Sequence, residues 1–287
     1  MTLTLDALAR PAGGFAMVAM DQRGSLRDML AAHPGRASDD GALVEFKLAV
    51  ARELGPLASG FLIDREYGFA RVAGVRLLPE SCGLILAVDA LQQRPGGPVE
   101  ETDLDPAVDP AAARAAGAVA LKLLLIWRDD ERRAARLDLA ARFVETCRRA
   151  GLLSVLEGVA RPATDAAIVA AAAELGALQP SLYKAQVPGL GEHDDAAASQ
   201  VCAEITKVVP VPWVVLSQGV PLERFNRAVE VAARAGASGF LAGRAVWSDT
   251  LAAADPVPDL RARSIPRLRA LTAIVDRYAR PWREAGG

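Results

Sequence analysis

The stretch Leu182-Tyr183-Lys184-Ala185-Gln186-Val187-Pro188 sets one lysine among apolar neighbours and stops at a proline. It belongs to a series of eight short apolar or β-branched runs. In chain order these are Gly14–Asp21, Ser59–Asp64, Gly83–Asp89, Ala118–Trp127, Leu153–Val159, Leu182–Val187, Pro212–Ser217 and Gly239–Gly243. Nearly continuous apolar character is typical of strands buried on both faces, as in a parallel sheet covered by helices.

Longer segments rich in alanine and arginine separate these runs and have helical periodicity. Asp129–Ala150 opens with acids and closes with arginines before a glycine, Thr164–Gly176 opens with a cap, and Pro221–Gly236 begins with proline. The segment Gln92–Asp109, rich in proline and acids, fits this pattern less well and reads as a linker. Eight strand–helix alternations favour an α/β fold, a (β/α)8 TIM barrel, over an open doubly wound sheet, with one domain spanning residues 1–287.

The composition excludes several classes of function. A formal charge of −2, with arginines scattered along the chain, gives no footprint for nucleic acid. No long uncharged apolar run indicates a membrane segment, so we expect a cytoplasmic protein. Three separated cysteines and two histidines favour neither a disulfide framework nor a metal site, and we expect no cofactor.

Polar residues stand where the expected strands end, which is where this barrel class builds its sites. They are Asp21-Gln22-Arg23, Asp64, Asp89, Lys122, Arg128, Glu157, Lys184, Ser217-Gln218-Gly219 and Gly243-Arg244. Burying unpaired charges costs several kcal/mol each, so such a set requires either mutual pairing or a ligand. A structural ring of salt bridges is the alternative to a binding site.

Lys184 is the candidate for covalent chemistry. The chain has only four lysines, of which Lys47 and Lys207 lie in helix-like segments and are expected to serve solubility alone. Desolvation and a neighbouring cation, such as Lys122, lower the pKa of an amine, and a neutral amine attacks a carbonyl to form a Schiff base. Glu157, on the preceding strand, is placed to act as general acid or base. A buried Glu157–Lys184 pair without a catalytic role remains open.

Two glycine-containing turns after the last two expected strands indicate a phosphate site. Ser217 and Gly219 follow one strand, and Gly243 and Arg244 follow the other. Glycine lets backbone N–H groups approach an anion, and a guanidinium binds it in bidentate fashion.

Seven segments in order resemble the lysine-dependent (class I) aldolases that include tagatose-1,6-bisphosphate aldolase and sulfofructosephosphate aldolase. They are GGFAMVAMDQRGSL, FLIDREYG, ALKLLLIWR, GLLSVLEGVARP, LYKAQVP, PWVVLSQGV and AGASGFLAGRAVW. Ile126-Trp127-Arg128 and the segment 240–247 look more like the sulfofructosephosphate branch, whereas FLIDREYG looks closer to the tagatose branch. We take the sulfofructosephosphate branch as the closer resemblance.

The resemblance implies a metal-free barrel that cleaves 6-deoxy-6-sulfofructose 1-phosphate into dihydroxyacetone phosphate and 3-sulfolactaldehyde, a step of sulfoglycolysis. Its motifs give Lys184 as the Schiff-base lysine, Glu157 as the acid/base group and Lys122 as a second active-site lysine. They assign the phosphate to Ser217, Gly219, Gly243 and Arg244, and the first-strand cluster near the substrate to Asp21, Gln22 and Arg23. Further substrate contacts are expected from Asp64, Arg128 and Gln186, with the sulfonate meeting Arg23 or Arg128. The chain departs from the family with Gln186, where glutamate is frequent, and Gln218, where serine is frequent.

Three other functions remain open on the sequence. Another ketose phosphate, such as tagatose 1,6-bisphosphate, would use the same lysine. A metal-dependent aldolase is disfavoured by the scarcity of histidine. A sugar-phosphate-binding sensor would keep the fold without the chemistry. The expected partners are a small-molecule ketose phosphate and further copies of this chain in a homo-oligomer, with neither nucleic acid nor membrane.

Overall fold

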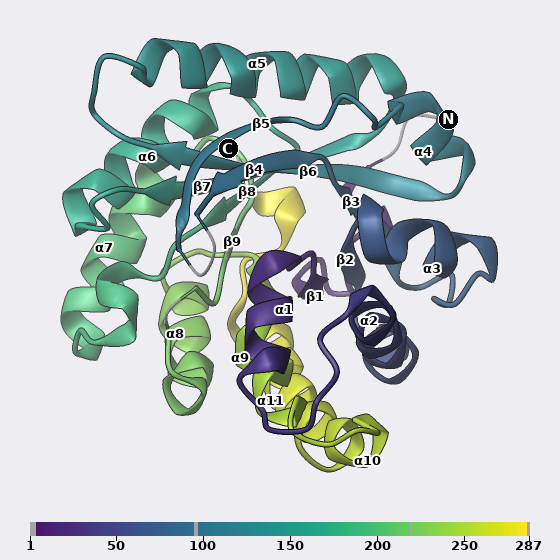
Figure 1. The fold of residues 1–287 in the computed structure, drawn as a ribbon. Helices are drawn as coiled ribbons and strands as arrows, with labels where there is room; N and C mark the ends of the chain where they lie inside the picture. Colours follow the sequence, from purple (N-terminus) through teal and green to yellow (C-terminus); the bar gives the residue numbers. More distant parts are fainter. Residues whose placement is uncertain (1–3, 95–96, 219, 286–287) are drawn as a thin grey trace.

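Eight parallel strands close into a barrel in a computed structural model that describes residues 4–94, 97–218 and 220–285 (Figure 1). The barrel strands are β1 (Phe15–Met20), β2 (Gly60–Asp64), β3 (Gly83–Ala87), β6 (Ala118–Trp127), β7 (Leu153–Ala160), β8 (Leu182–Ala185), β9 (Trp213–Val215) and β10 (Gly239–Ala242). Around the barrel their order is β1-β10-β9-β8-β7-β6-β3-β2. All eight sequence runs therefore become barrel strands, and the predicted (β/α)8 fold is confirmed.

Helices connect the strands and cover the outside of the barrel (Figure 1). They are α1 (Gly24–Ala31), α2 (Asp40–Leu54), α3 (Ala70–Gly74), α4 (Pro110–Ala115), α5 (Arg133–Ala150), α6 (Asp165–Ala177), α7 (Asp195–Val208), α8 (Leu222–Arg234), α9 (Arg244–Trp247), α10 (Val257–Asp259) and α11 (Ile265–Tyr278). Among the residues described, no helix is both long and apolar enough to cross a membrane.

The helix ends follow the local sequence signals. The side chain of Thr164 accepts a hydrogen bond from the N–H of Ala167 at the start of α6. Gly151 has φ +67° after α5, so the predicted glycine cap is confirmed. Helix α5 begins at Arg133 rather than at Asp129, because the side chain of Asp130 accepts the N–H of Arg132 in a turn ahead of the helix.

Two apolar layers result from the alternation of side chains along the strands. Residues such as Val18, Phe61 and Leu156 face outward and pack against the helices. The other set, including Met17 and Val155, fills the barrel interior. This interior cluster also contains Leu5 and Leu8 of the N-terminal segment. The inward-facing apolar layer forms the floor on which the polar residues at the strand ends rest.

The segment predicted as a linker contains an antiparallel hairpin of β4 (Asp89–Gln93) and β5 (Val99–Leu104). Figure 1 shows the hairpin between α5 and the barrel strands. Arg136 of α5 is buried and forms ion pairs with Glu101 of β5 and with Asp130. The expectation of a simple linker was wrong, because Glu101, which looks solvent-directed in the sequence, accepts hydrogen bonds from Arg136 of α5 and from Arg128.

Candidate active site

A polar layer lies directly above the apolar floor at the carboxyl ends of the strands. On β7 the interior residue Val155 is followed two positions later by Glu157, and on β8 Leu182 is followed by Lys184. Because alternate residues of a strand face the same side, these polar side chains continue the inward-facing rows. All of them are reached from the open end of the barrel.

Lys184 and Glu157 are paired by the strand register, in which their Cα atoms are direct partners between β8 and β7. The Nζ of Lys184 lies 3.0 Å from Oε2 of Glu157. The two residues are only 4% and 6% exposed. The structure therefore brings together the two residues that the sequence offered as nucleophile and acid/base group.

Lys122 of β6 links Glu157 to two aspartates. Its Nζ lies 2.9 Å from Oε2 of Glu157, 2.8 Å from Oδ2 of Asp21 and 3.2 Å from Oδ1 of Asp89. One carboxylate oxygen of Glu157 thus faces the Nζ atoms of both Lys122 and Lys184. Two amines and three carboxylates form a continuous charged cluster across the barrel mouth.

The cluster shifts the pKa values of its members. Burial raises the pKa of Glu157, but the charges of Lys122 and Lys184 outweigh burial and hold this pKa below the ordinary value. The same two lysines, with Arg23, outweigh burial at Asp21 and lower its pKa far below the usual range. Burial lowers the pKa of Lys122, and the surrounding carboxylates reverse this and raise it well above 10.5. Glu157 is accordingly a carboxylate at neutral pH, able to accept a proton.

Arg23 is held by Asp89, a residue for which the sequence suggested no specific role. The Nη1 of Arg23 donates to the backbone oxygen of Asp89 at 2.8 Å, and Nη2 donates to Oδ2 at 2.8 Å. Burial lowers the pKa of Arg23, while Asp89 and Asp21 raise it, with a net rise. The charge of Arg23 is therefore already balanced within the protein, although its buried Nε has no hydrogen-bond partner among the described residues.

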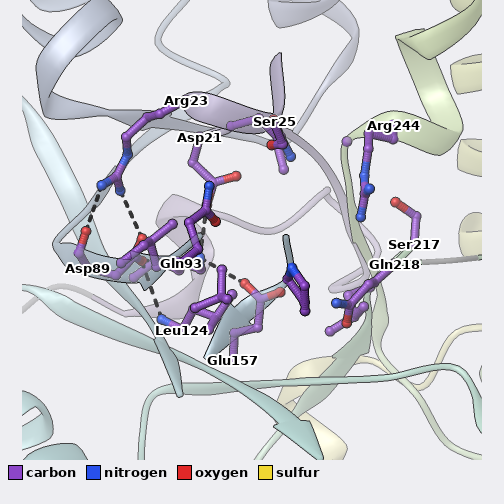
Figure 2. Close-up of a pocket in the computed structure, with 18 of the residues that line it drawn as sticks. Asp21, Arg23, Ser25, Asp89, Gln93, Leu124, Glu157, Ser217, Gln218 and Arg244 are labelled. Atoms are coloured by element: carbon purple, nitrogen blue, oxygen red, sulfur yellow. Dashed lines mark hydrogen bonds and ion pairs between the residues drawn. The ribbon is translucent and has the colours of Figure 1, made fainter. Parts of the chain in front are cut away.

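A cavity of about 620 Å³ opens above the cluster. Figure 2 shows Glu157 between two groups of side chains, namely Arg23 with Asp89, and Ser217 with Gln218 and Arg244. The wall also includes residues of the β4–β5 hairpin, Leu91, Gln93, Pro98 and Val99, together with Arg161. The sequence gave no signal for the hairpin side of this wall, because the hairpin was not predicted.

The predicted phosphate residues Ser217, Gly243 and Arg244 line the cavity together. A Cβ added at Gly243 would lie 2.7 Å from the carbonyl oxygen of Ala19 and 2.8 Å from Nε2 of Gln22, so only glycine allows this close approach. Gly219 lies outside the described residues.

Gln22 and Gln186 also line the cavity. The buried Oε1 of Gln22 has no hydrogen-bond partner among the described residues. Gln186 is buried, and its Oε1 accepts a hydrogen bond from the backbone N–H of Ala160 at 2.6 Å. A glutamate at position 186 would also accept this N–H, so glutamine preserves the contact that orients the end of β7 while removing a negative charge.

Asp64 does not line the cavity, contrary to the prediction. Its carboxylate is fully buried and is bound by Lys47 of α2 and by the backbone N–H of Tyr67. Lys47 is also fully buried, and burial lowers its pKa despite the charge of Asp64. The Nζ of Lys47 donates to the backbone oxygens of Met20 and Gln22, at 2.7 Å each. The expectation that Lys47 serves only solubility was therefore wrong.

Arg128 also lies outside the cavity wall. Its Nη1 donates to the backbone oxygen of Glu100 and pairs with Glu101 at 3.2 Å. The acids of β5 attract this guanidinium to the hairpin, which the sequence did not reveal. Among the described residues, no group of three or more His, Cys, Asp or Glu side chains is arranged to hold a metal ion.

The sequence profile of the DeoC/LacD family of aldolases matches residues 15–249. The chain belongs to this family. It is therefore an enzyme, a carbon–carbon lyase of the class I aldolase type. The match runs from the first residue of β1 to beyond α9, and so includes every strand of the barrel and all the charged groups described above.

Similar proteins cover nearly the whole aldolase. Tagatose 1,6-diphosphate aldolase of Listeria monocytogenes serotype 4b is 26% identical over 318 residues, covering 97% of this chain and 92% of that protein. Tagatose 1,6-diphosphate aldolase 1 of Streptococcus mutans serotype c is 27% identical over 296 residues, covering 88% of each chain. A solved archaeal fructose-1,6-bisphosphate aldolase, with its catalytic lysine bound to the carbinolamine intermediate of the substrate, has a TM-score of 0.64 at 19% identity and covers 95% of this chain and 98% of that one. This structural likeness shows the shared fold.

Proposed function

We propose that the aldolase cleaves 6-deoxy-6-sulfofructose 1-phosphate into dihydroxyacetone phosphate and 3-sulfolactaldehyde through a Schiff base on Lys184. The observation that carries the Schiff base is the buried contact of Lys184 with Glu157, whose carboxylate also meets Lys122. The sulfonated substrate rests on the resemblance of Ile126-Trp127-Arg128 and the segment 240–247 to the sulfofructosephosphate branch. An amine that forms a Schiff base requires a neighbouring group that accepts and returns protons, and Glu157 lies within hydrogen-bond distance.

The first half of the mechanism forms the iminium. The neutral amine of Lys184 adds to the ketone carbon, and the resulting carbinolamine loses water. Glu157, whose Oε2 lies 3.0 Å from Nζ, moves the proton that the amine sheds to the former ketone oxygen, and a second proton, taken up from solvent, lets that hydroxyl group leave as water. The solved archaeal relative, trapped as the carbinolamine of its catalytic lysine, supports this kind of intermediate for the fold.

The second half breaks the carbon–carbon bond. The electron pair of the bond between C3 and C4 moves toward the iminium and yields an enamine, while Glu157 accepts the proton of the C4 hydroxyl, so that C4 leaves as an aldehyde. Protonation of the enamine at C3 and hydrolysis by water release dihydroxyacetone phosphate and the free amine. In this scheme Lys122 holds the carboxylates of Glu157 and Asp21 in place.

The ends of the substrate are assigned to the two sides of the cavity. Ser217, Gly243 and Arg244 are proposed to bind the phosphate next to the ketone, since they lie together on the wall formed by β9 and β10. Gln22 and Arg23 are proposed to meet substrate hydroxyl groups, since both line the cavity. These assignments require no metal ion.

Reductive trapping tests the Schiff base. Incubation with dihydroxyacetone phosphate and borohydride is expected to add the reduced triose phosphate covalently to the peptide that contains Lys184, as measured by mass spectrometry. The Lys184→Met variant should lose retro-aldol activity, whereas Lys207→Met, which alters an exposed lysine of α7, should remain active. An unmodified Lys184 together with an active Lys184→Met variant would overturn the proposal.

Tagatose 1,6-bisphosphate is a second candidate substrate, because the relatives in Listeria and Streptococcus are named for its cleavage. The two substrates differ in the anion at the end remote from the ketone. Comparison of kcat/KM for the sulfonate and the bisphosphate, with release of dihydroxyacetone phosphate coupled to NADH oxidation, separates them. A higher kcat/KM for the bisphosphate would reverse our assignment while leaving the Schiff base intact.

A further inference from the structure

Most of the described charged side chains that line the cavity are paired, and the exceptions are the exposed carboxylate of Glu66 and two arginines. Asp21 and Glu157 are paired with Lys122, and Glu157 also with Lys184. Asp89 is paired with Arg23 as well as with Lys122. Among the described residues that line the cavity, this leaves two guanidinium groups with no carboxylate within ion-pair distance, those of Arg161 and Arg244.

Arg244 belongs to the proposed phosphate site, but Arg161 has been assigned no role so far. Arg161 follows the last residue of β7 and is partly buried in the cavity wall. Its backbone N–H donates to the carbonyl oxygen of Trp127 at 2.8 Å, which anchors the start of the loop. An arginine held in a partly enclosed wall without a counter-ion indicates an anionic ligand, because removing a charge from water without a partner is unfavourable.

The order of strands around the barrel matches the order of groups along the substrate. Strand β8, with Lys184, lies between β9 on one side and β7 on the other. Ser217 and Arg244 follow β9 and β10, and Glu157 and Arg161 belong to β7 and the loop after it. A ketose whose phosphate lies toward β9 and β10, and whose ketone meets Lys184, presents its C4 hydroxyl to Glu157 on β7. Its remaining carbons then extend toward the mouth of the cavity on the side of Arg161.

The other arginines near this side are already engaged. Arg128 is bound to the hairpin acids, and the two Nη atoms of Arg23 are bound to Asp89. Both were expected from the sequence to receive the sulfonate. An anion would have to compete with a carboxylate for either of them, whereas Arg161 has no such competitor among the described residues.

We propose that Arg161 binds the anionic group at the end of the substrate opposite the ketone-side phosphate, a tetrahedral oxyanion carried by the aldehyde product. This inference rests on the proposed aldolase reaction and adds the residue that selects its charged aldehyde. The planar guanidinium offers paired N–H donors to two oxygens of a sulfonate or a phosphate. In this arrangement the two arginines that have no acidic partner within the described part of the chain bind the two ends of one ligand.

The test uses the condensation direction, in which dihydroxyacetone phosphate reacts with aldehydes of different charge. The aldehydes are 3-sulfolactaldehyde, glyceraldehyde 3-phosphate and uncharged glyceraldehyde. Arg161→Gln is expected to lower kcat/KM for the charged aldehyde that the enzyme prefers by about 100-fold, mainly through KM, because a charge-assisted contact in a partly enclosed site is lost. The kcat/KM for glyceraldehyde should change by less than about threefold, since this aldehyde has no anionic group for Arg161 to bind and the catalytic groups are unchanged.

Two further variants serve as controls for Arg161→Gln. Arg161→Lys retains the charge but not the fork, so it should recover part of the loss. Arg142→Gln, which removes an exposed arginine of α5, should leave all three aldehydes unaffected. The charged aldehyde whose kcat/KM falls more in Arg161→Gln identifies the group, sulfonate or phosphate, that Arg161 binds.

The failure of this inference is distinguishable from failure of the proposed reaction. If wild-type Lys184 is not trapped by borohydride, the reaction itself is wrong. Lys184 can instead be trapped both in the wild type and in Arg161→Gln. If kcat/KM then falls equally for charged and uncharged aldehydes, or falls for neither, Arg161 does not bind the anion at the end of the substrate opposite the ketone-side phosphate. Circular dichroism of Arg161→Gln confirms that the comparison is made on folded enzyme, and Arg161→Lys supports the same decision if Arg161→Gln fails to fold.

Discussion

Replacing Lys47 with methionine is the perturbation for which the structure predicts the largest loss. Lys47 and Asp64 are both fully buried and form an ion pair between α2 and the end of β2. The ammonium also donates to the carbonyl oxygens of Met20 and Gln22, at 2.7 Å each. Methionine has a similar length and is apolar, so the change removes the charge and the hydrogen bonds while filling most of the space.

The expected loss of stability comes from the buried groups that Lys47→Met leaves without a partner. Breaking a buried pair by removing one partner costs about 3–5 kcal/mol, because the remaining charge is left uncompensated. The two carbonyl oxygens lose a donor, and each unsatisfied buried group adds up to about 1–3 kcal/mol, which relaxation and water partly offset. We therefore expect the free energy of unfolding to fall by about 3–5 kcal/mol, a large share of the roughly 5–15 kcal/mol of a typical domain.

Activity should fall as well, because the two carbonyls flank Asp21. Lys47 holds the chain on both sides of this residue, whose carboxylate binds Lys122 in the cluster that contains Glu157. A displacement of about 1 Å at a catalytic group can cost about 100-fold in rate. A fall in kcat of at least about tenfold is expected in the fraction that remains folded.

Urea unfolding followed by circular dichroism measures the stability, and the retro-aldol assay measures kcat. Lys207→Met serves as the matched control, since that lysine lies exposed near the end of α7, and no change is expected. The double variant Lys47→Met/Asp64→Asn removes both charges and should be less destabilised than the sum of the single variants. A Lys47→Met protein with the stability and kcat of Lys207→Met would refute the reasoning.

Three other predictions concern the cluster and the hairpin. Arg136→Met removes the buried guanidinium that pairs with Glu101 and Asp130, so we expect the free energy of unfolding in urea to fall by about 1–3 kcal/mol, consistent with a lost charged hydrogen bond. The KM should rise because the cavity wall is loosened, and an unchanged KM would show that the hairpin does not shape the site. The pKa of Asp21 is lowered on folding, so the stability that its carboxylate contributes is present above about pH 4 and is lost as the pH falls. In Asp21→Asn, the unfolding free energy should therefore decline less steeply below pH 4, by at most about 1.4 kcal/mol per pH unit. A slope equal to that of the wild type would contradict this linkage. Lys122→Gln removes a charge that lowers the pKa of Glu157, so this pKa should rise. The acidic limb of the plot of kcat against pH should then move to higher pH. An acidic limb at the same pH as in the wild type would show that Glu157 is not the titrating base.

The barrel was predictable from the sequence because its strands are buried on both faces. A run such as Ala118–Trp127 needs no knowledge of its neighbours to be recognised, since continuous apolar character is what such burial requires. The caps of α5 and α6 were likewise local signals. The β4–β5 hairpin escaped prediction because its strands lie on the outside of the barrel, where they carry polar and acidic residues that bind arginines distant in the chain.

Within the site, the sequence by itself determined which residue types stand at the strand ends, and alternation along β7 and β8 then directs Glu157 and Lys184 inward. Only the tertiary structure decided which charges meet. The sequence offered Arg23 and Arg128 for the sulfonate and gave no signal for Arg161, yet the first two are bound by acids and Arg161 faces the cavity without one among the described residues. Lys47 and Asp64 likewise form a buried support beneath Asp21. The physical reason is that strand direction follows from local periodicity, whereas the balance of a charge depends on side chains that folding brings from elsewhere in the chain.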